Sequence, residues 1–217
     1  MAVEALHTAA NGRGQTRTRL LLTALHLYAQ EGLDAVSLRR ISADAGSRNS
    51  AAMHYHFRNK LGVIQALVEM IADELAGAAR QIRDQESKPR DLRTAFKNTL
   101  RPLAELPERQ PWGRDAIRFM SRVLSESNAE TAAVVNPVYA SFWGRVDGQL
   151  AELLPELPDD VRRLRLMFMS VTVFHGIAEV GSLSHTPLGD LSHFSREALL
   201  DHLADFLIGG LKANTTT

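Results

Sequence analysis

The sequence contains no cysteine among its 217 residues. This absence excludes disulfide bonds, thiol nucleophiles and thiolate metal ligands, and it fits a reducing compartment. Long hydrophobic runs are missing too, because the longest, residues 166–174, is less than half of what a membrane-spanning helix needs. The N-terminal residues lack the basic and apolar regions of a secretory signal peptide. We therefore expect a soluble, cytoplasmic protein with no membrane partner.

Patterns for catalysis and metal binding are also missing. His54 and His56 stand two residues apart, so on a helix they point to different sides and cannot bind one metal ion together. His185, His193 and His202 lack acidic partners at helical spacing, and no HExxH motif, glycine-rich phosphate loop or GxSxG motif occurs. We expect no metal, no cofactor and no enzymatic activity. The alternative, an all-helical enzyme, rests only on a serine that lies near a histidine in the sequence.

The charged residues are unevenly distributed, although the formal net charge is zero. The first 60 residues hold eight Lys or Arg against four Asp or Glu, and the remaining residues hold 17 against 21. A basic N-terminal part on a mildly acidic remainder is typical of a protein whose N-terminal part meets phosphate. Ordinary variation in charge gives similar splits, so this pattern needs support from motifs.

The segment from Ser37 to Lys60 predicts two short helices joined by a turn, followed by the start of a third helix. Ser37 is a suitable N-cap, and apolar residues follow it at the spacing of one buried helical stripe. Gly46 stands where a helix would end in a left-handed residue. Asn49 or Ser50 can cap the second helix. This is the helix-turn-helix arrangement, whose second helix enters the DNA major groove.

The rest of the chain is helical in pattern, and no segment shows the period-two alternation of a strand. The fold class expected is all-α, with an N-terminal three-helix helix-turn-helix head and a C-terminal helical bundle. Further helices are expected at about 16–30, 61–83, 92–106, 112–125, 132–154, 159–183 and 195–211. The expected divisions are a mobile arm at 1–15, a DNA-binding domain at 16–60, a connecting helix at 61–83, and a C-terminal domain at 84–217.

Three consecutive motifs resemble the N-terminal domain of the TetR family of bacterial transcriptional regulators. They are a helix end at Tyr28–Gly32, the segment Ser37–Gly46, and the segment His54–Leu61 with its YHF and Lys pattern. The resemblance covers about residues 17–70. It implies an all-helical homodimer with a helix-turn-helix head and a variable body that binds a small ligand. On this resemblance the C-terminal helical bundle, residues 84–217, is the expected effector-binding and dimerisation domain.

The resemblance also implies roles for single residues. Ser37 would cap the first motif helix and touch a phosphate, and Lys60 would reach a second phosphate. Tyr55 and His56 would lie near the DNA backbone or bases, and Phe57 would anchor the core.

The turn departs from the family pattern, because the segment from Gly46 to Phe57 is one residue longer than in most members. His54 stands where the family usually has an aromatic residue. The resemblance therefore leaves two alignments of the second helix, one residue apart, which differ by about 100° in the face that meets the bases. Arginines at 13, 17 and 19 are further candidates for phosphate contact. The predicted DNA-binding residues are Ser37, Arg39, Arg40, Arg48, Asn49, Ser50, Met53, His54, Tyr55, His56 and Lys60.

Two sets of apolar residues in the body have two interpretations each. Aromatic and methionine side chains in the central helices either form the core or line an apolar ligand site. The ligand candidates are Phe96, Trp112, Phe119, Met120, Tyr139, Phe142, Trp143, Met167, Phe168 and His175. The stripes of the last two long helices either cover their own core or form half of a four-helix interface with a second copy. The interface candidates are Leu164, Val171, Phe174, Ala178, Leu199, Leu203, Phe206 and Leu207.

The sequence thus predicts a ligand-responsive repressor that binds a pseudo-palindromic operator as a homodimer. A largely apolar small molecule would release it by favouring a second arrangement of the 61–83 helix, which would move the two heads apart. The alternative keeps the DNA-binding head but makes the body a protein-interaction module without a small ligand.

Overall fold

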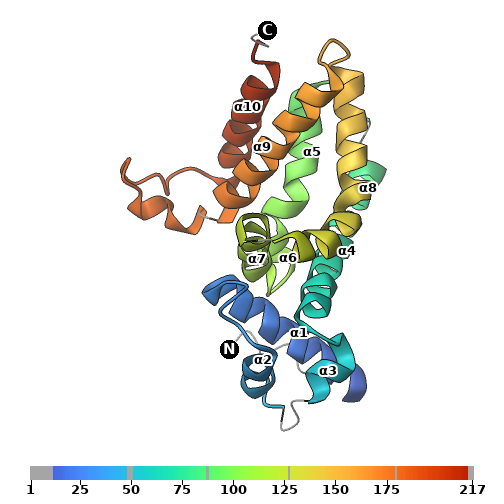
Figure 1. Cartoon of the computed structure of the whole chain (residues 1–217). Coiled ribbons are helices and arrows are strands. Elements are labelled where there is room, and N and C mark those ends of the chain that lie inside the picture. The colour runs from blue at the N-terminus through green and yellow to red at the C-terminus, as the bar shows by residue number, and fades with distance from the viewer. Residues whose placement is uncertain (1–11, 48–50, 87, 127, 179, 215–217) are drawn as a thin grey trace. The chain divides into compact units, whose positions relative to one another are not determined.

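A computed structural model describes residues 12–47, 51–86, 88–126, 128–178 and 180–214, which are mainly helical (Figure 1). The helices are α1 Gly12–Glu31, α2 Leu38–Asp44, α3 Ala51–Phe57, α4 Lys60–Gln85, α5 Leu92–Ala104, α6 Leu106–Arg109, α7 Gly113–Glu126, α8 Ala129–Leu153, α9 Asp159–Ala178 and α10 Arg196–Lys212, with a 3₁₀ helix, η1, at Val180–His185. Apart from one isolated bridge between Thr186 and Gly189, the described ranges contain no β pairing. The all-α fold class is confirmed.

Several helix boundaries differ from those expected. Helix α1 already begins at Gly12, inside the segment expected to be a mobile arm. Helix α8 begins at Ala129 because the Asn128 side chain caps it by accepting from the Thr131 backbone N–H at 2.9 Å, and Pro137 lies inside this helix. Helix α9 ends at Ala178, and the tighter η1 replaces its expected last turn.

The chain divides into two compact units that do not follow the expected divisions. Unit 1 comprises Met1–Asp73 and Pro107–Val138, and unit 2 comprises Glu74–Leu106 and Tyr139–Thr217. Helix α4 is therefore shared between them, and the polar 84–91 segment is not the boundary. Helix α7 belongs to the same unit as the three N-terminal helices because it packs against α1.

Unit 1 is built around α1, which packs against α2 and α7 (Figure 1). The Tyr28 ring of α1 stacks on the Phe119 ring of α7, with centroids 6.1 Å apart, and both side chains are fully buried. Phe57 is the last residue of α3 and is buried, as expected for a residue that anchors the core. Helix α2 packs in turn against α3, so both helices of the pair belong to this unit.

The Tyr28 hydroxyl gives a test of this core. Its oxygen is buried without a hydrogen-bond partner among the described residues, and burial raises the pKa of the hydroxyl. Because an unsatisfied buried hydroxyl costs about 1–3 kcal/mol, we expect Tyr28→Phe to leave the free energy of unfolding unchanged or raise it. Urea unfolding of the two proteins measures the difference. A loss of about 1 kcal/mol or more would mean that the hydroxyl is satisfied after all.

Unit 2 is held together by α10, which packs against α5 and α9 (Figure 1). Ion pairs bind α5 to α10: Lys97 Nζ lies 2.7 Å from the Asp201 carboxylate, and Arg93 pairs with Asp205. Arg165 of α9 donates to the Leu211 carbonyl at 2.6 Å, near the C-terminal end of α10, where a cation is favoured.

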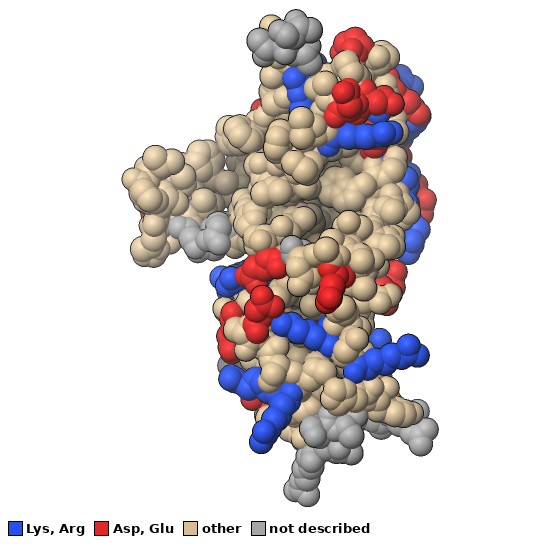
Figure 2. Space-filling view, in the orientation of Figure 1, with Lys and Arg blue, Asp and Glu red and all other residues tan. Residues whose placement is uncertain are grey.

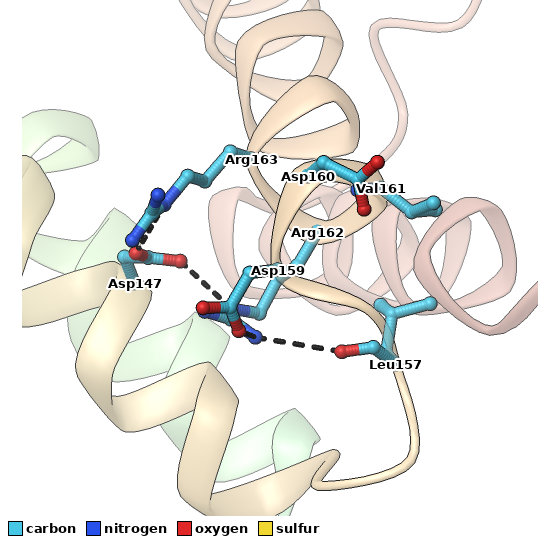
Figure 3. A network of polar contacts seen from close by, with 7 residues as sticks. All are labelled: Asp147, Leu157, Asp159, Asp160, Val161, Arg162 and Arg163. Carbon is cyan, nitrogen blue, oxygen red and sulfur yellow. Dashed lines mark hydrogen bonds and ion pairs between the residues drawn. The ribbon is translucent and has the colours of Figure 1, made fainter.

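The turn between α8 and α9 is fixed by a network around a buried arginine (Figure 3). Arg162 is only 4% exposed and donates through Nε to Asp147 at 2.7 Å and through Nη1 to Asp159 at 2.8 Å. Arg163 donates to the other oxygen of Asp147 at 3.0 Å. One carboxylate of α8 thereby holds two arginines from the start of α9, and these bonds lower the pKa of Asp147.

Candidate nucleic-acid interface

Helix α2 begins and ends as the sequence predicts. The Ser37 Oγ accepts from the Arg40 backbone N–H at 3.2 Å, which satisfies a helix N–H that would otherwise lack a partner. At the other end Gly46 has φ +65°, and the Ser47 N–H donates to the Ser42 carbonyl at 2.9 Å. A glycine adopts this left-handed conformation without a Cβ penalty, so α2 stops and the chain turns.

Helix α3 has one buried face and one exposed face. Met53 and Phe57 are buried, whereas His54 and Tyr55 are exposed, and Tyr55 is 76% exposed. Met53 is thus a core residue and not the DNA contact that the sequence predicts. The reason is its spacing of four residues from Phe57, which puts both on the inner side of the helix.

The turn between α3 and α4 is strained and is held by His54. Arg58 has φ +64°, a conformation that residues other than glycine seldom adopt. The His54 Nδ1–H donates to the Arg58 carbonyl at 2.9 Å, and the Arg58 N–H donates to the His54 carbonyl at 3.0 Å. His54 therefore stabilises this turn, a role that the predicted DNA contact did not include.

Helix α4 begins at the turn with a capped N-terminus. The Asn59 side chain accepts from the Gly62 N–H at 2.9 Å, and Lys60 is the first helical residue. A Cβ at Gly62 would stand 2.0 Å from the Phe57 carbonyl oxygen, so the two backbones approach closely here. The Lys60 Nζ lies 3.3 Å from the Asp34 carboxylate, which is itself largely exposed to solvent.

Several Lys and Arg side chains lie on the surface of the N-terminal helices, and some of them form ion pairs with carboxylates of the same helices. Figure 2 shows Lys and Arg side chains on the surface of the part that carries α1, α2 and α3. Arg40 donates to Asp44 at 2.6 Å and also pairs with Glu31, and these contacts raise its pKa. Arg39 is exposed. Arg17 of α1 lies over the Phe57 ring, with its guanidinium carbon 5.2 Å from the centroid.

The remaining predicted DNA contacts differ in exposure, and three of them are not described by the structure. Ser37 is exposed and His56 is half-buried. Arg48, Asn49 and Ser50 lie outside the described residues. Among the other described candidates, Arg39 and Tyr55 are exposed and Lys60 is half-buried.

The predicted ligand residues fall into both units. Trp112, Phe119 and Met120 belong to unit 1, where Phe119 and Met120 are buried in the packing of α7. The other seven belong to unit 2, and among them Phe96 is buried while the rings of Phe142 and Trp143 meet edge to face at 5.0 Å. Tyr139, Phe142, Trp143 and His175 are half-buried, and Met167 and Phe168 are exposed.

The predicted interface residues are also divided by burial. Leu164, Val171 and Phe206 are exposed, and Phe174, Ala178, Leu199 and Leu203 are half-buried. Leu207 is 3% exposed and packs inside its own unit, because it lies on the side of α10 that also buries Ala204 and Leu211. Leu207 is thus a core residue and not an interface residue.

Two acidic residues of α7 accept hydrogen bonds from the head, and no local pattern in the sequence indicated them. Glu126 accepts from the Leu33 backbone N–H at 2.7 Å, 93 residues away in the sequence. Asp115 accepts from His26 Nδ1–H at 2.9 Å and from the Gln30 side chain at 3.1 Å. Contacts at such separations depend on the packing of α7 against α1, which hydrophobic periodicity alone does not specify.

Other kinds of site find no support in the part of the chain that the structure describes. That part contains no cluster of three or more His, Asp or Glu side chains arranged to hold a metal ion. Nor does any of its helices combine the length and the apolar character needed to cross a membrane.

The fold and the capped helix pair define a helix-turn-helix protein, and comparison with known families gives the family. The model of "Bacterial regulatory proteins, tetR family" matches residues 20–67, and that of "Tetracyclin repressor-like, C-terminal domain" matches residues 97–210, more than half of the chain. The chain therefore belongs to the TetR family of bacterial transcriptional regulators. The family consists of DNA-binding regulators.

The match to an individual curated relative covers only part of the chain. The chain is 35% identical over 72 residues to the HTH-type transcriptional repressor KstR2 of Rhodococcus jostii, a match that covers 33% of this chain and 35% of that protein. The match thus spans about a third of the relative's length.

Two solved structures show the same fold over nearly the whole chain. The fatty acid degradation regulator FadR of Bacillus halodurans has a TM-score of 0.63 at 17% identity, covering 95% of this chain and 100% of that one. NalD, the secondary repressor of the MexAB-OprM multidrug efflux pump in Pseudomonas aeruginosa, has a TM-score of 0.61 at 19% identity, covering 91% and 95%.

Proposed function

We propose that this regulator is a repressor that binds a pseudo-palindromic operator as a homodimer and is released from it by a largely apolar small molecule. The observation that carries the proposal is the helix pair α2 and α3 of unit 1, in which Ser37 caps α2 and Tyr55 of α3 is 76% exposed. Lys and Arg side chains lie on the surface of this part of the molecule (Figure 2). A helix-turn-helix of this kind reads the major groove with its second helix while flanking groups fix the phosphates.

The phosphate contacts are proposed for Ser37, Arg39, Lys60 and Arg17. Within the described part of the chain, Lys60 pairs with one exposed carboxylate, that of Asp34, so a phosphate can replace this partner at little cost. Arg40 has two carboxylate partners within the head, and binding DNA through it would require breaking both contacts. We therefore propose that Arg40 braces α2 against α1 and that base reading falls to Tyr55, His56 and residues 48–50.

A salt titration tests the role of Lys60. If Lys60 neutralises one phosphate, Lys60→Ala weakens operator binding and reduces the slope of log K against log salt by about 1. The operator is a duplex selected from random sequences with the wild-type protein, and fluorescence anisotropy gives the affinity at several salt concentrations. Lys88→Ala is the matched control, because it removes from unit 2 a lysine that likewise pairs with a carboxylate.

The outcomes of this titration separate the function from the residue. Failure of the wild-type protein to select any duplex would contradict the proposed function. An unchanged affinity and slope for Lys60→Ala, with a working wild type, would remove only Lys60 from the phosphate contacts. Lys88→Ala is expected to behave as wild type in both respects.

The effector is proposed to bind in unit 2. Figure 2 shows a hollow in an uncharged part of the surface, over the region that α5, α9 and the second half of α8 occupy in Figure 1. The half-buried rings of Phe142 and Trp143 belong to that part of α8. An uncharged, aromatic surrounding favours an apolar ligand. Such a ligand can release DNA only to the extent that it binds the DNA-free state more tightly than the bound one.

The homodimer is proposed to form through the exposed apolar face of α9 together with α10. Leu164, Met167, Phe168 and Val171 are exposed and lie at the spacing of one helical stripe, and Phe206 of α10 is exposed as well. Met167 and Phe168 are therefore assigned to the interface and not to the ligand site. A symmetric pair of such faces forms a four-helix interface, which brings together two heads for two half-sites.

A further inference from the structure

The turn that leads into α2 depends on a carboxylate from outside the helix-turn-helix. Residues 32–37 connect α1 to α2, and Leu33 and Val36 are buried within this connection. The Leu33 N–H donates to Glu126 Oε2 at 2.7 Å in a part-buried setting. A buried N–H without a hydrogen-bond partner is costly, and the bond to Glu126 gives the Leu33 N–H its partner.

The carboxylate of Glu126 is itself held in place from two sides. Arg122, one turn earlier on α7, donates to Glu126 Oε1 at 2.8 Å. Gly32 has φ +93°, and a Cβ at this glycine would stand 3.1 Å from Glu126 Oε2. The glycine therefore gives the turn its left-handed conformation and leaves room for the carboxylate at the same place.

Two more contacts of α7 follow the same face of the helix. Asp115 accepts from His26 and Gln30 of α1, and Phe119 stacks on Tyr28. Asp115, Phe119, Arg122 and Glu126 are spaced at i, i+4, i+7 and i+11, which is one side of an α-helix. Helix α7 is thus fixed along α1, with Glu126 at the end that faces the α1–α2 turn.

We propose that Glu126 is a positioning residue for the DNA-reading helices. Glu126 binds the backbone of the 32–37 turn at Leu33. The end of this turn is Ser37, which caps α2, and α2 packs against α3. A displacement of α7 along α1 would therefore change the start of α2 and the placement of the reading helix. The inference rests on the proposed function, because it assigns Glu126 an effect on operator binding.

Amide hydrogen exchange tests the contact without DNA. Glu126→Ala leaves the Leu33 N–H without its charged acceptor, so we expect the exchange of this amide to become about tenfold faster or more. The amides in the middle of α10, which lies in unit 2, serve as the internal reference and are expected to stay unchanged. Exchange at Leu33 within twofold of the wild-type rate would overturn the proposal.

Operator binding tests the consequence, and the sign of the effect separates position from charge. Removing a negative charge near DNA strengthens binding by electrostatics alone, whereas loss of the position of α2 weakens it. We expect Glu126→Ala to bind the selected operator about tenfold more weakly, with a smaller change on an unrelated duplex. Glu126→Gln keeps an oxygen acceptor for the Leu33 N–H and is expected to recover most of the operator affinity.

Glu130→Gln is the matched control, since it removes an equal charge from an exposed site of unit 1. It is expected to bind the operator as tightly as wild type or slightly more tightly. Equal losses on the operator and the unrelated duplex, or equal losses for Glu126→Ala and Glu126→Gln, would overturn the positioning role. Failure of the wild-type protein to prefer any duplex would instead contradict the proposed function.

Discussion

Replacing Arg162 by alanine is expected to lower the free energy of unfolding by about 3 kcal/mol. The arginine is 4% exposed and bonds to Asp147, Asp159 and the Leu157 carbonyl (Figure 3). Removing one member of a buried ion pair leaves the other charge without its partner, which typically costs 3–5 kcal/mol. We expect the lower end of this range, because Asp147 and Asp159 keep access to water, with side-chain exposures of 18% and 72%.

Arg163 provides a control of the same chemistry at the same carboxylate. It donates to Asp147 at 3.0 Å but its side chain is 65% exposed. An exposed ion pair contributes about 0–1 kcal/mol, so Arg163→Ala is expected to have a small effect. Urea unfolding followed by circular dichroism measures both variants. Equal losses from the two substitutions would mean that burial of Arg162 does not determine its contribution.

An apolar replacement separates the ion pair from the packing around it. The double variant Arg162→Met, Asp147→Leu removes both charges and fills a similar volume. Such replacements of buried ion pairs are often neutral or stabilising. We therefore expect the double variant to recover most of the stability that Arg162→Ala loses.

The pH dependence of stability provides a second measurement on the same pair. Hydrogen bonding to Arg162 lowers the pKa of Asp147 below its ordinary 3.8. A carboxylate with a lowered pKa in the folded state contributes stability above 3.8, and this contribution is lost as the pH falls from 3.8 through the lowered value. In Arg162→Ala the loss of stability over this range is expected to be smaller than in wild type.

Local signals explain what could be predicted of the fold and the head. Ser37 as an N-cap, Gly46 as a left-handed helix end and Phe57 as a buried anchor each depend on neighbours within a few residues. Together with the helical periodicity they predicted the all-α class and the helix-turn-helix, and the matched family models confirm the family.

Non-local packing explains what could not be predicted. The Glu126–Leu33 and Asp115–His26 contacts join residues about 90 positions apart, and they exist only because α7 lies along α1. The same packing assigns α7 to the unit of the head, although a division by linker composition put it in the body.

The direction in which single side chains face was the second point on which the structure differs from the sequence-based prediction. A stripe of apolar residues on a helix has two sides, and the sequence does not say which side meets the core. Met53 and Leu207 proved to be core residues, whereas Met167 and Phe168 are exposed. His54 turns toward the strained Arg58 backbone, a partner that follows from the conformation of the turn and not from the residue type.

The exposed apolar face of α9 carries the second large effect. Phe168→Glu is expected to convert the proposed dimer into a monomer. The exposures of Leu164, Met167, Phe168 and Val171 lie between 42% and 56%, and Phe206 is 68% exposed. Burying a large apolar side chain contributes about 1.5–3 kcal/mol, so this set, present twice in a symmetric interface, supplies much of the association energy.

A carboxylate at the centre of such a face must be buried without a partner or keep the two faces apart. Because the interface is symmetric, one substitution puts two like charges into it. Sedimentation velocity over a range of protein concentrations is expected to show a dimer for wild type and a monomer for Phe168→Glu. The monomer has one head for one half-site, so its operator affinity is expected to fall by a factor of about 10 or more.

Leu188→Glu is the control for this substitution, because Leu188 is 87% exposed and lies in the 186–189 turn, outside both helical faces. It adds the same charge to an exposed apolar position and is expected to leave the dimer and the operator affinity unchanged. If Phe168→Glu remained a dimer of wild-type stability, α9 would not form the interface. If it became a monomer but kept its operator affinity, the two heads would not bind cooperatively, and the pseudo-palindromic operator would lose its physical basis.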